Sequence, residues 1–157
     1  MKTTIFRTGM IALVFSAALF IVSCDKDGNI DNNDTYTLSG NGSGAQEVPT
    51  NSSSGTATLT GTYNATTNQL VYDINWSNLT NIATAVHFHG PAPMGVSAGV
   101  LVGLTVTNTA INGRANGTVT LTQAQETALL NGEVYYNIHT AAFPDGEVRG
   151  QVSAVLN

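Results

Sequence analysis

All three histidines of the chain lie in two short segments in which polar and apolar side chains alternate. In the first segment, Val86 and Phe88 share one face of a predicted β-strand, and His87 and His89 share the other. In the second, the same alternation puts His139 opposite the bulky apolar side chains. If the two strands lie close together in one sheet, three imidazoles converge on the side that faces away from the core. We therefore expect any chemistry of this protein at that face.

Two histidines separated by one residue on a strand suit a metal site. Their Cα atoms are about 6.5–7 Å apart, so the rings of His87 and His89 both reach one ion. Imidazole nitrogens are ligands for copper and zinc. His139 supplies a third nitrogen, and Asp145 or Glu147 offers an oxygen. If an ion is bound, the pattern favours copper or zinc.

The same residues also fit a hydrogen-bonded brace that holds no metal. In this alternative His87 bonds a backbone carbonyl of the loop that follows its strand, and His139 contacts a carboxylate. Arg149 pairs with a carboxylate as well, and its charge repels a cation held beside it. Besides the histidines, the residues assigned to this brace are Asn137, Asp145, Glu147 and Arg149. The sequence favours the brace, assigns no cofactor with certainty and leaves the metal site as the alternative.

The N-terminal segment predicts secretion and a lipid anchor. Lys2 and Arg7 precede an apolar run that is too short for a comfortable membrane span. The run ends in Ile21-Val22-Ser23-Cys24, which resembles a bacterial lipobox, in which cleavage occurs just before the cysteine that receives the lipid. We therefore expect a signal peptide over 1–23 and lipidation of Cys24. The lipid would hold the protein at a membrane of the bacterial cell envelope, such as the outer membrane, facing the periplasm or the surface.

The remaining 134 residues have the composition of a secreted β-protein. They contain three basic and all ten acidic residues, a net charge of −7. Such a surface repels phosphate backbones, so nucleic acid is excluded as a partner. Residues 24–34 are rich in Asp and Asn and form a predicted flexible tether, which leaves one domain over 35–157. Cys24 is the only cysteine, so no intramolecular disulfide forms.

Short alternating segments separated by turn residues predict an all-β domain of about eight strands with one short helix. The predicted strands are 35–39, 56–62, 70–76, 83–89, 99–104, 117–121, 133–140 and 147–155. The glycine-rich stretch 40–44 is expected to be a turn, and Thr122 to cap the helix over 122–130. Trp76 is expected in the core and Thr58 on the outer face of its strand. The fold class is therefore a Greek-key β-sandwich.

Several motifs, in order along the chain, resemble the chordin-type CHRD domain family. They are Leu38-Ser39-Gly40, Gln46-Glu47-Val48-Pro49, Gly55-Thr56-Ala57, Leu70-Val71-Tyr72, His87-Phe88-His89-Gly90-Pro91-Ala92, Tyr136-Asn137-Ile138-His139-Thr140-Ala141-Ala142-Phe143-Pro144 and Gly146-Glu147-Val148-Arg149-Gly150-Gln151. The resemblance spans roughly residues 36–155. It implies an immunoglobulin-like or superoxide-dismutase-like sandwich, and it does not imply a reaction.

The sequence offers no arrangement of residues typical of catalysis. Ser39 and Ser97 lack the context of a nucleophile elbow, and the carboxylates show no paired acid/base spacing. We therefore expect a protein that is not an enzyme: a lipid-tethered module that binds a protein or glycan partner. The alternative is a copper- or zinc-binding lipoprotein that uses the three histidines.

Overall fold

The structure, a computed structural model, describes residues 34–157. The predicted signal peptide, Cys24 and all of the predicted tether except Asp34 lie outside these residues. Within residues 34–157, no helix has the length and apolar character needed to cross a membrane.

The described chain forms ten strands, one α-helix and one short 3₁₀ helix. The strands are β1 (Thr35–Ser43), β2 (Thr56–Asn64), β3 (Gln69–Ser77), β4 (Ala83–His89), β5 (Val100–Gly103), β6 (Val106–Asn108), β7 (Gly113–Thr120), β8 (Tyr135–Thr140), β9 (Val148–Gln151) and β10 (Ser153–Leu156). The helices are η1 (Gly44–Gln46) and α1 (Gln123–Leu130). The all-β class with one short α-helix is confirmed.

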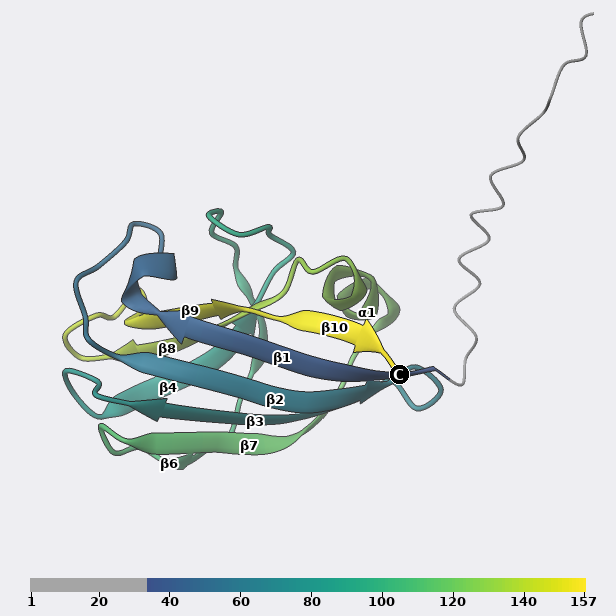
Figure 1. The fold of residues 1–157 in the computed structure, drawn as a ribbon, viewed down its shortest axis with the longest axis horizontal. Coiled ribbons are helices and arrows are strands. Elements are labelled where there is room, and N and C mark those ends of the chain that lie inside the picture. The colour runs from purple at the N-terminus through teal and green to yellow at the C-terminus, as the bar shows by residue number, and fades with distance from the viewer. Residues whose placement is uncertain (1–33) are drawn as a thin grey trace, which may run out of the picture.

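All ten strands belong to one antiparallel sheet that curls into two layers. The strand order is β5-β4-β8-β9-β1-β2-β3-β7-β6, and β10 pairs with β1. In Figure 1, β1, β2, β3 and β7 form the near layer and β4 and β8 lie behind them. The layers meet where Ser43 of β1 pairs with Arg149 of β9. The predicted sandwich therefore exists, but its layers are parts of a continuous sheet.

Two segments of chain pass from one layer to the other and close the sides of the sandwich. β5 pairs with β4 and β6 pairs with β7, although only Leu104 and Thr105 separate β5 from β6. On the other side, β9 pairs with β8 and β10 pairs with β1, with Val152 between them. Strands that bend in this way form the corners of closed sandwiches.

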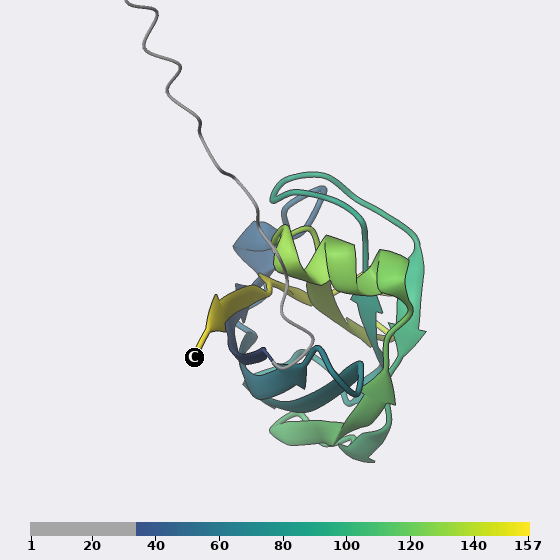
Figure 2. The same ribbon diagram turned by 90° about the vertical axis from the view of Figure 1, so that its right-hand side faces the viewer.

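The core lies between the layers and is built from every second residue of the strands. Tyr72 of β3 meets Phe88 of β4 edge to face, with ring centroids 5.8 Å apart, so the two layers are in direct contact. Trp76 is buried as expected, and its indole N–H donates to the carbonyl of Ala110 at 2.9 Å. The helix α1 packs at one end of the sandwich, where Leu129 is fully buried (Figure 2).

The prediction of a turn over 40–44 is wrong, because β1 continues to Ser43. The glycines serve close packing instead of a turn. A Cβ on Gly40 would lie 2.6 Å from the carbonyl oxygen of Gln151, and one on Gly42 would lie 2.7 Å from the hydroxyl of Tyr136. Glycine in a strand therefore marks the place where Tyr136 crosses the core and donates to the carbonyls of Gly40 and Ala57.

The bounds of the other strands differ from the predicted ones by smaller amounts. The segment 147–155 is divided into β9 and β10 by the crossing between layers, β7 begins earlier than predicted at Gly113, and the three-residue strand β6 was missed. The helix is capped as predicted. Thr122 and Gln125 form a capping box, in which each side chain accepts from the other residue's backbone N–H.

Candidate metal centre

Strands β4 and β8 place the three histidines on the outer side of the back layer. They are neighbours in the sheet, and their register pairs Phe88 with Tyr136 and Ala85 with His139. Val86 and Phe88 are buried in the core, so His87 and His89 face outward. The expected convergence of the histidines occurs because antiparallel pairing brings His139 next to the His-x-His segment.

The three imidazoles form a compact cluster. Nδ1 of His87 lies 3.2 Å from Nε2 of His139. Ring centroids are 4.9 Å apart for His87 and His139, 5.6 Å for His87 and His89, and 5.8 Å for His89 and His139. One nitrogen from each ring lies within 4.8 Å of the other two. Two nitrogens bound to one ion at 2.0–2.1 Å are about 3.4–3.6 Å apart, so side-chain shifts of about 1 Å would complete a site.

Backbone carbonyls fix the tautomers of two of the rings. Nδ1 of His89 lies 3.1 Å from the carbonyl oxygen of Ala98, and Nδ1 of His139 lies 3.0 Å from that of Pro144. A carbonyl oxygen only accepts, so each Nδ1 carries a proton and each neutral ring presents a lone pair at Nε2. This second hydrogen bond is the one that metal-binding histidines ordinarily make.

One of these lone pairs is buried and has no partner. Among residues 34–157, Nε2 of His89 is one of four buried side-chain nitrogen and oxygen atoms without a hydrogen bond. Buried polar atoms are almost always paired, because leaving one unpaired costs about 1–3 kcal/mol. A buried lone pair on a ring that lies beside two other imidazoles is the arrangement a metal ion would satisfy.

The environment of His87 and His89 favours their neutral form. Burial lowers the pKa of His87, and the nearby charge of His139 lowers it further. Burial also lowers the pKa of His89; the bond to Ala98 opposes this shift, and charges on His139, His87 and Arg149 add to it. Neutral rings are the form that ligates metal, so protons compete less with an ion here than at an exposed histidine.

Tyr135 packs against His89, and Arg149 packs against Tyr135. The ring of Tyr135 stacks on His89 at 5.0 Å with an interplanar angle of 10°, and the guanidinium carbon of Arg149 lies 3.6 Å from the Tyr135 ring centroid. Arg149 donates to the carbonyls of Pro93 and Val96, at 3.3 and 2.8 Å. The predicted pairing of Arg149 with a carboxylate is therefore wrong: loop carbonyls satisfy this cation, and in residues 34–157 the one ion pair joins Arg114 to Asp73.

A buried glutamate that sequence reasoning did not single out lies beside Asn137. Glu47 accepts from Nδ2 of Asn137 at 3.4 Å, and its Oε1 and the Asn137 Oδ1 have no partner. Burial raises the pKa of Glu47 to about 7, against the lowering effects of Arg149 and Asn137. Its only sequence signal is its place in the Gln46-Glu47-Val48-Pro49 motif.

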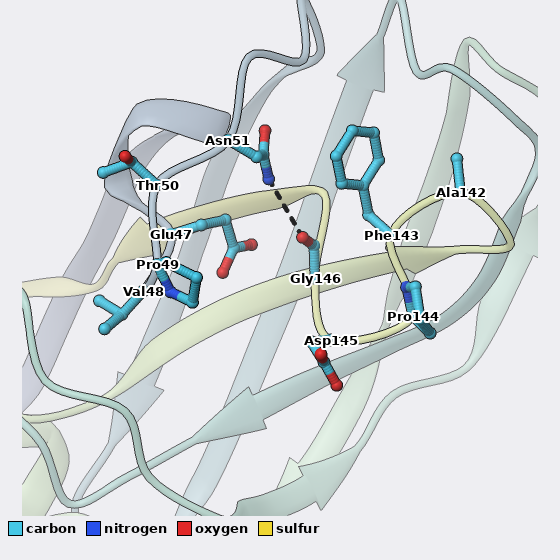
Figure 3. A pocket seen from close by; sticks show the side chains of 10 residues that line it. All are labelled: Glu47, Val48, Pro49, Thr50, Asn51, Ala142, Phe143, Pro144, Asp145 and Gly146. Carbon is cyan, nitrogen blue, oxygen red and sulfur yellow. Dashed lines mark hydrogen bonds between the residues drawn. The ribbon is translucent and has the colours of Figure 1, made fainter.

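The loops carrying Glu47 and Pro144 enclose a pocket of about 260 Å³. Figure 3 shows the Glu47 side chain reaching toward Gly146, and Asn51 donating to the Gly146 carbonyl at 3.2 Å. A Cβ on Gly146 would overlap the amide of Asn137 and the carboxyl of Glu47. Glycine at this position therefore lets the 142–146 loop lie directly over the two side chains.

The other residues assigned to the brace have different roles. Glu147 is fully buried, and it accepts from Ser53 at 2.7 Å, from the backbone N–H of Thr80 at 2.6 Å and from Thr140 at 2.6 Å. Burial alone would raise the pKa of Glu147, but these hydrogen bonds outweigh it and leave the pKa lowered. Asp145 is exposed, and its backbone carbonyl, not its carboxylate, accepts from Asn137.

The expected histidine contacts also differ in detail. His87 bonds His139 instead of a loop carbonyl, and His139 bonds the carbonyl of Pro144 instead of the carboxylate of Asp145 or Glu147. Three imidazole nitrogens, without a carboxylate oxygen, are therefore the donors that the described residues offer to one ion.

Comparisons with known proteins place this arrangement in a family. The family model for the CHRD domain matches residues 38–152, which include all three histidines, Glu47 and Arg149. No curated protein matches the chain. No solved structure matches it either. On the match over 38–152, the chain belongs to the CHRD domain family.

Proposed function

We propose that this protein is a lipid-anchored, extracytoplasmic CHRD module that binds copper or zinc through His87, His89 and His139. The observation that carries the metal-binding role is the buried, unpartnered Nε2 of His89, whose tautomer is fixed by the carbonyl of Ala98. The proximity of the other two rings and the Pro144 bond to His139 support it. A brace alone leaves that lone pair unexplained.

The role is binding without catalysis. Metal catalysis of hydrolysis needs an activated water and, in most cases, a general base beside the ion. Of the two buried carboxyls of the region, Glu147 accepts three hydrogen bonds, and neither Glu147 nor Glu47 belongs to the group of side chains that could share one ion. The ion would then be held for storage or transfer.

Calorimetry tests the metal-binding role. The full chain, without a histidine tag and in mild detergent, is melted with and without Zn²⁺, Cu²⁺ or, under anaerobic reducing conditions, Cu⁺. An ion at 100 times its Kd adds about 2.7 kcal/mol of stability, which raises Tm by about 10 °C in a domain of this size. His87→Ala, His89→Ala and His139→Ala should each remove most of the gain and stay folded without metal.

The pH dependence adds an independent check. The gain in Tm should shrink below the usual histidine range and vanish near about pH 5, where protonated imidazoles no longer ligate. Thr58→Ala, on the exposed face of the other layer, is the matched control and should keep the full gain. If none of the three ions changes Tm, and the histidine variants destabilise the protein without metal, the cluster is a structural brace.

The lipid anchor rests on the sequence around Cys24. If Cys24 is lipidated, the protein should partition into the detergent phase, because each buried CH₂ adds about 0.8 kcal/mol. Cys24→Ser should appear in the aqueous phase or remain unprocessed. Equal partitioning of the two forms would rule out the anchor and leave the metal-binding role untouched.

A protein or glycan partner is the second candidate ligand. Val48 and Met94 are 41% and 68% exposed and lie on two loops that line a shared hollow of about 390 Å³. Replacing both with Ser should abolish partner binding and leave metal binding unchanged, which a pull-down alongside the calorimetry would show.

A further inference from the structure

The donor atoms of the histidine cluster bring no negative charge to an ion. In residues 34–157, the His, Cys, Asp and Glu side chains close enough to share one ion are three histidines. A neutral imidazole gives a lone pair but leaves the formal charge of the ion unchanged. A site built from carboxylates or thiolates would cancel part of that charge. The charge of the ion therefore decides how costly its burial is here.

A fixed positive charge is buried behind the cluster. Arg149 is 2% exposed and lies against Tyr135, whose ring stacks on His89. The charged groups that act on His89 are Arg149 and the other two histidines, and each of them disfavours a positive charge on its ring.

The acidic groups around the site compensate for Arg149 only in part. Glu47 has a pKa of about 7, so near neutral pH it is negative in about half of the molecules. Glu147 keeps its negative charge, but it is not among the groups that act on His87 or His89, and Asp145 is exposed to solvent, which screens its charge.

A monovalent ion suits such a site better than a divalent one. Repulsion from Arg149 is twice as large for a charge of +2 as for +1. The cost of removing an ion from water grows as the square of its charge, so it is four times larger for the divalent ion. Building on the proposed metal-binding function, we infer that the cluster is a Cu⁺ site that discriminates against Zn²⁺.

Coordination number favours the same ion. Cu⁺ is satisfied by two or three nitrogens, a number that the three imidazoles supply without a further ligand. Zn²⁺ at a three-histidine site takes a water as its fourth ligand. Nε2 of His89 has almost no exposed surface, so that side of the cluster leaves little room for a fourth ligand.

Two competition titrations of the tag-free full chain in detergent test the inference. Under anaerobic conditions Cu⁺ is titrated against bicinchoninate, and Zn²⁺ is titrated separately against a chromogenic zinc indicator. We expect one Cu⁺ per chain and an affinity for Cu⁺ at least about 1,000-fold above that for Zn²⁺. Arg149→Gln should raise the Zn²⁺ affinity about tenfold more than the Cu⁺ affinity, since the removed repulsion is larger for the divalent ion.

Two further variants guard against a folding defect in Arg149→Gln. Glu47→Gln, measured at pH 8 where Glu47 is mostly ionised, should weaken Zn²⁺ binding more than Cu⁺ binding. Arg114→Gln removes the same charge from an exposed position in the other layer and should leave the affinity ratio unchanged.

The outcomes separate the two claims. Zn²⁺ bound as tightly as Cu⁺, or an affinity ratio that neither Arg149→Gln nor Glu47→Gln shifts, overturns the inference and leaves the proposed metal-binding function standing. Binding of neither ion overturns both. Tight Cu⁺ binding with a ratio that moves in opposite directions in the two variants supports both.

Discussion

Strands β2 and β8 both alternate between core-facing and outward side chains, but their outward sides meet different surroundings. On β2 the outward residues are Thr56, Thr58, Thr60 and Thr62, and all four are exposed. On β8 Asn137 is 3% exposed, and on its neighbour β9 Arg149 is 2% exposed. The outward side of the back layer is therefore a second, polar interior.

Loops account for the difference. The 47–51, 91–98 and 142–146 loops lie over β4, β8 and β9, and polar side chains of those strands hold each loop. Asn137 bonds Glu47, Arg149 bonds the carbonyls of Pro93 and Val96, and His139 bonds that of Pro144. The comparison teaches that alternation tells which side of a strand faces away from the core, while the loops decide whether that side meets water.

The largest expected effect concerns the inner face, which the two layers share. Trp76→Ala removes a buried ring and its hydrogen bond to Ala110, so it should cost on the order of 3–5 kcal/mol of unfolding free energy. Thr58→Ala, on the exposed outer face of β2, should change stability by no more than about 0.5 kcal/mol. Urea titration measures both, and similar losses would contradict the assignment of the two faces.

A glycine pair tests whether the loop over Asn137 is tightly packed. Gly146 has φ +138°, and Gly146→Ala would push a methyl group into Asn137 and Glu47. Strain and overlap together should cost about 3–4 kcal/mol. Gly95 also has a positive φ, +81°, but a Cβ there meets nothing within 4 Å.

Gly95→Ala should therefore cost only the backbone strain, about 1–2 kcal/mol. Thermal unfolding of the two variants isolates the packing contribution. Equal losses would show that the 142–146 loop moves away from Glu47 easily, and the polar interior would then be loosely covered.

The buried side chains of Glu47 and Glu147 should make opposite contributions to the pH dependence of the unfolding free energy. The pKa of Glu47 is raised from 4.5 to about 7, so its protonated form is favoured in the folded state. The stability it contributes is present below about pH 4.5 and is lost as pH rises toward 7. Glu47→Gln should therefore stabilise the protein at pH 8 by up to about 3 kcal/mol and remove that loss.

Glu147 provides the contrast, because its pKa is lowered in the folded state. Its stabilising contribution is present above the unfolded pKa and is lost as pH falls through the folded value. Glu147→Gln should destabilise the protein at pH 8 and flatten the acid limb of its stability curve. Unfolding free energies measured from pH 3 to 8 would show both trends. If the free energies of Glu47→Gln and Glu147→Gln change with pH in the same way, the two glutamates do not have opposite environments.

The sequence predicted the inner faces well and the covered outer face only in part. Alternation determines burial on the core side, so the assignments of Trp76, Val86 and Phe88 follow directly. The histidine cluster follows from two adjacent strands. The partners Ala98, Pro144 and Glu47 come from loops, whose conformation depends on distant contacts that no local pattern records. Gly40 was misassigned for the same reason, since the atom closest to a Cβ there is the backbone oxygen of Gln151, 111 residues away.

The smallest predicted effect comes from replacing an asparagine with alanine on the outer face of each layer, at Asn137 of β8 and at Asn75 of β3. Asn137→Ala removes the amide that donates to Glu47 and to the carbonyl of Asp145, and it leaves a small cavity under the 142–146 loop. Both hydrogen bonds are long, at 3.4 Å, and Oδ1 of Asn137 has no partner, so the loss should be about 1–2 kcal/mol.

Asn75 is the matched position on β3, where its amide donates to Asp73 at 3.0 Å on an exposed surface. Asn75→Ala should change the unfolding free energy by no more than about 0.5 kcal/mol, although its hydrogen bond is the shorter one, because water replaces the lost partner. Urea titration of both variants at pH 8, where Glu47 is mostly ionised, gives the sharpest contrast, since the loss of an N–H donor then leaves a buried charge less stabilised. If Asn75→Ala costs as much as Asn137→Ala, hydrogen-bond length and not burial sets the effect, and the two outer faces are energetically alike.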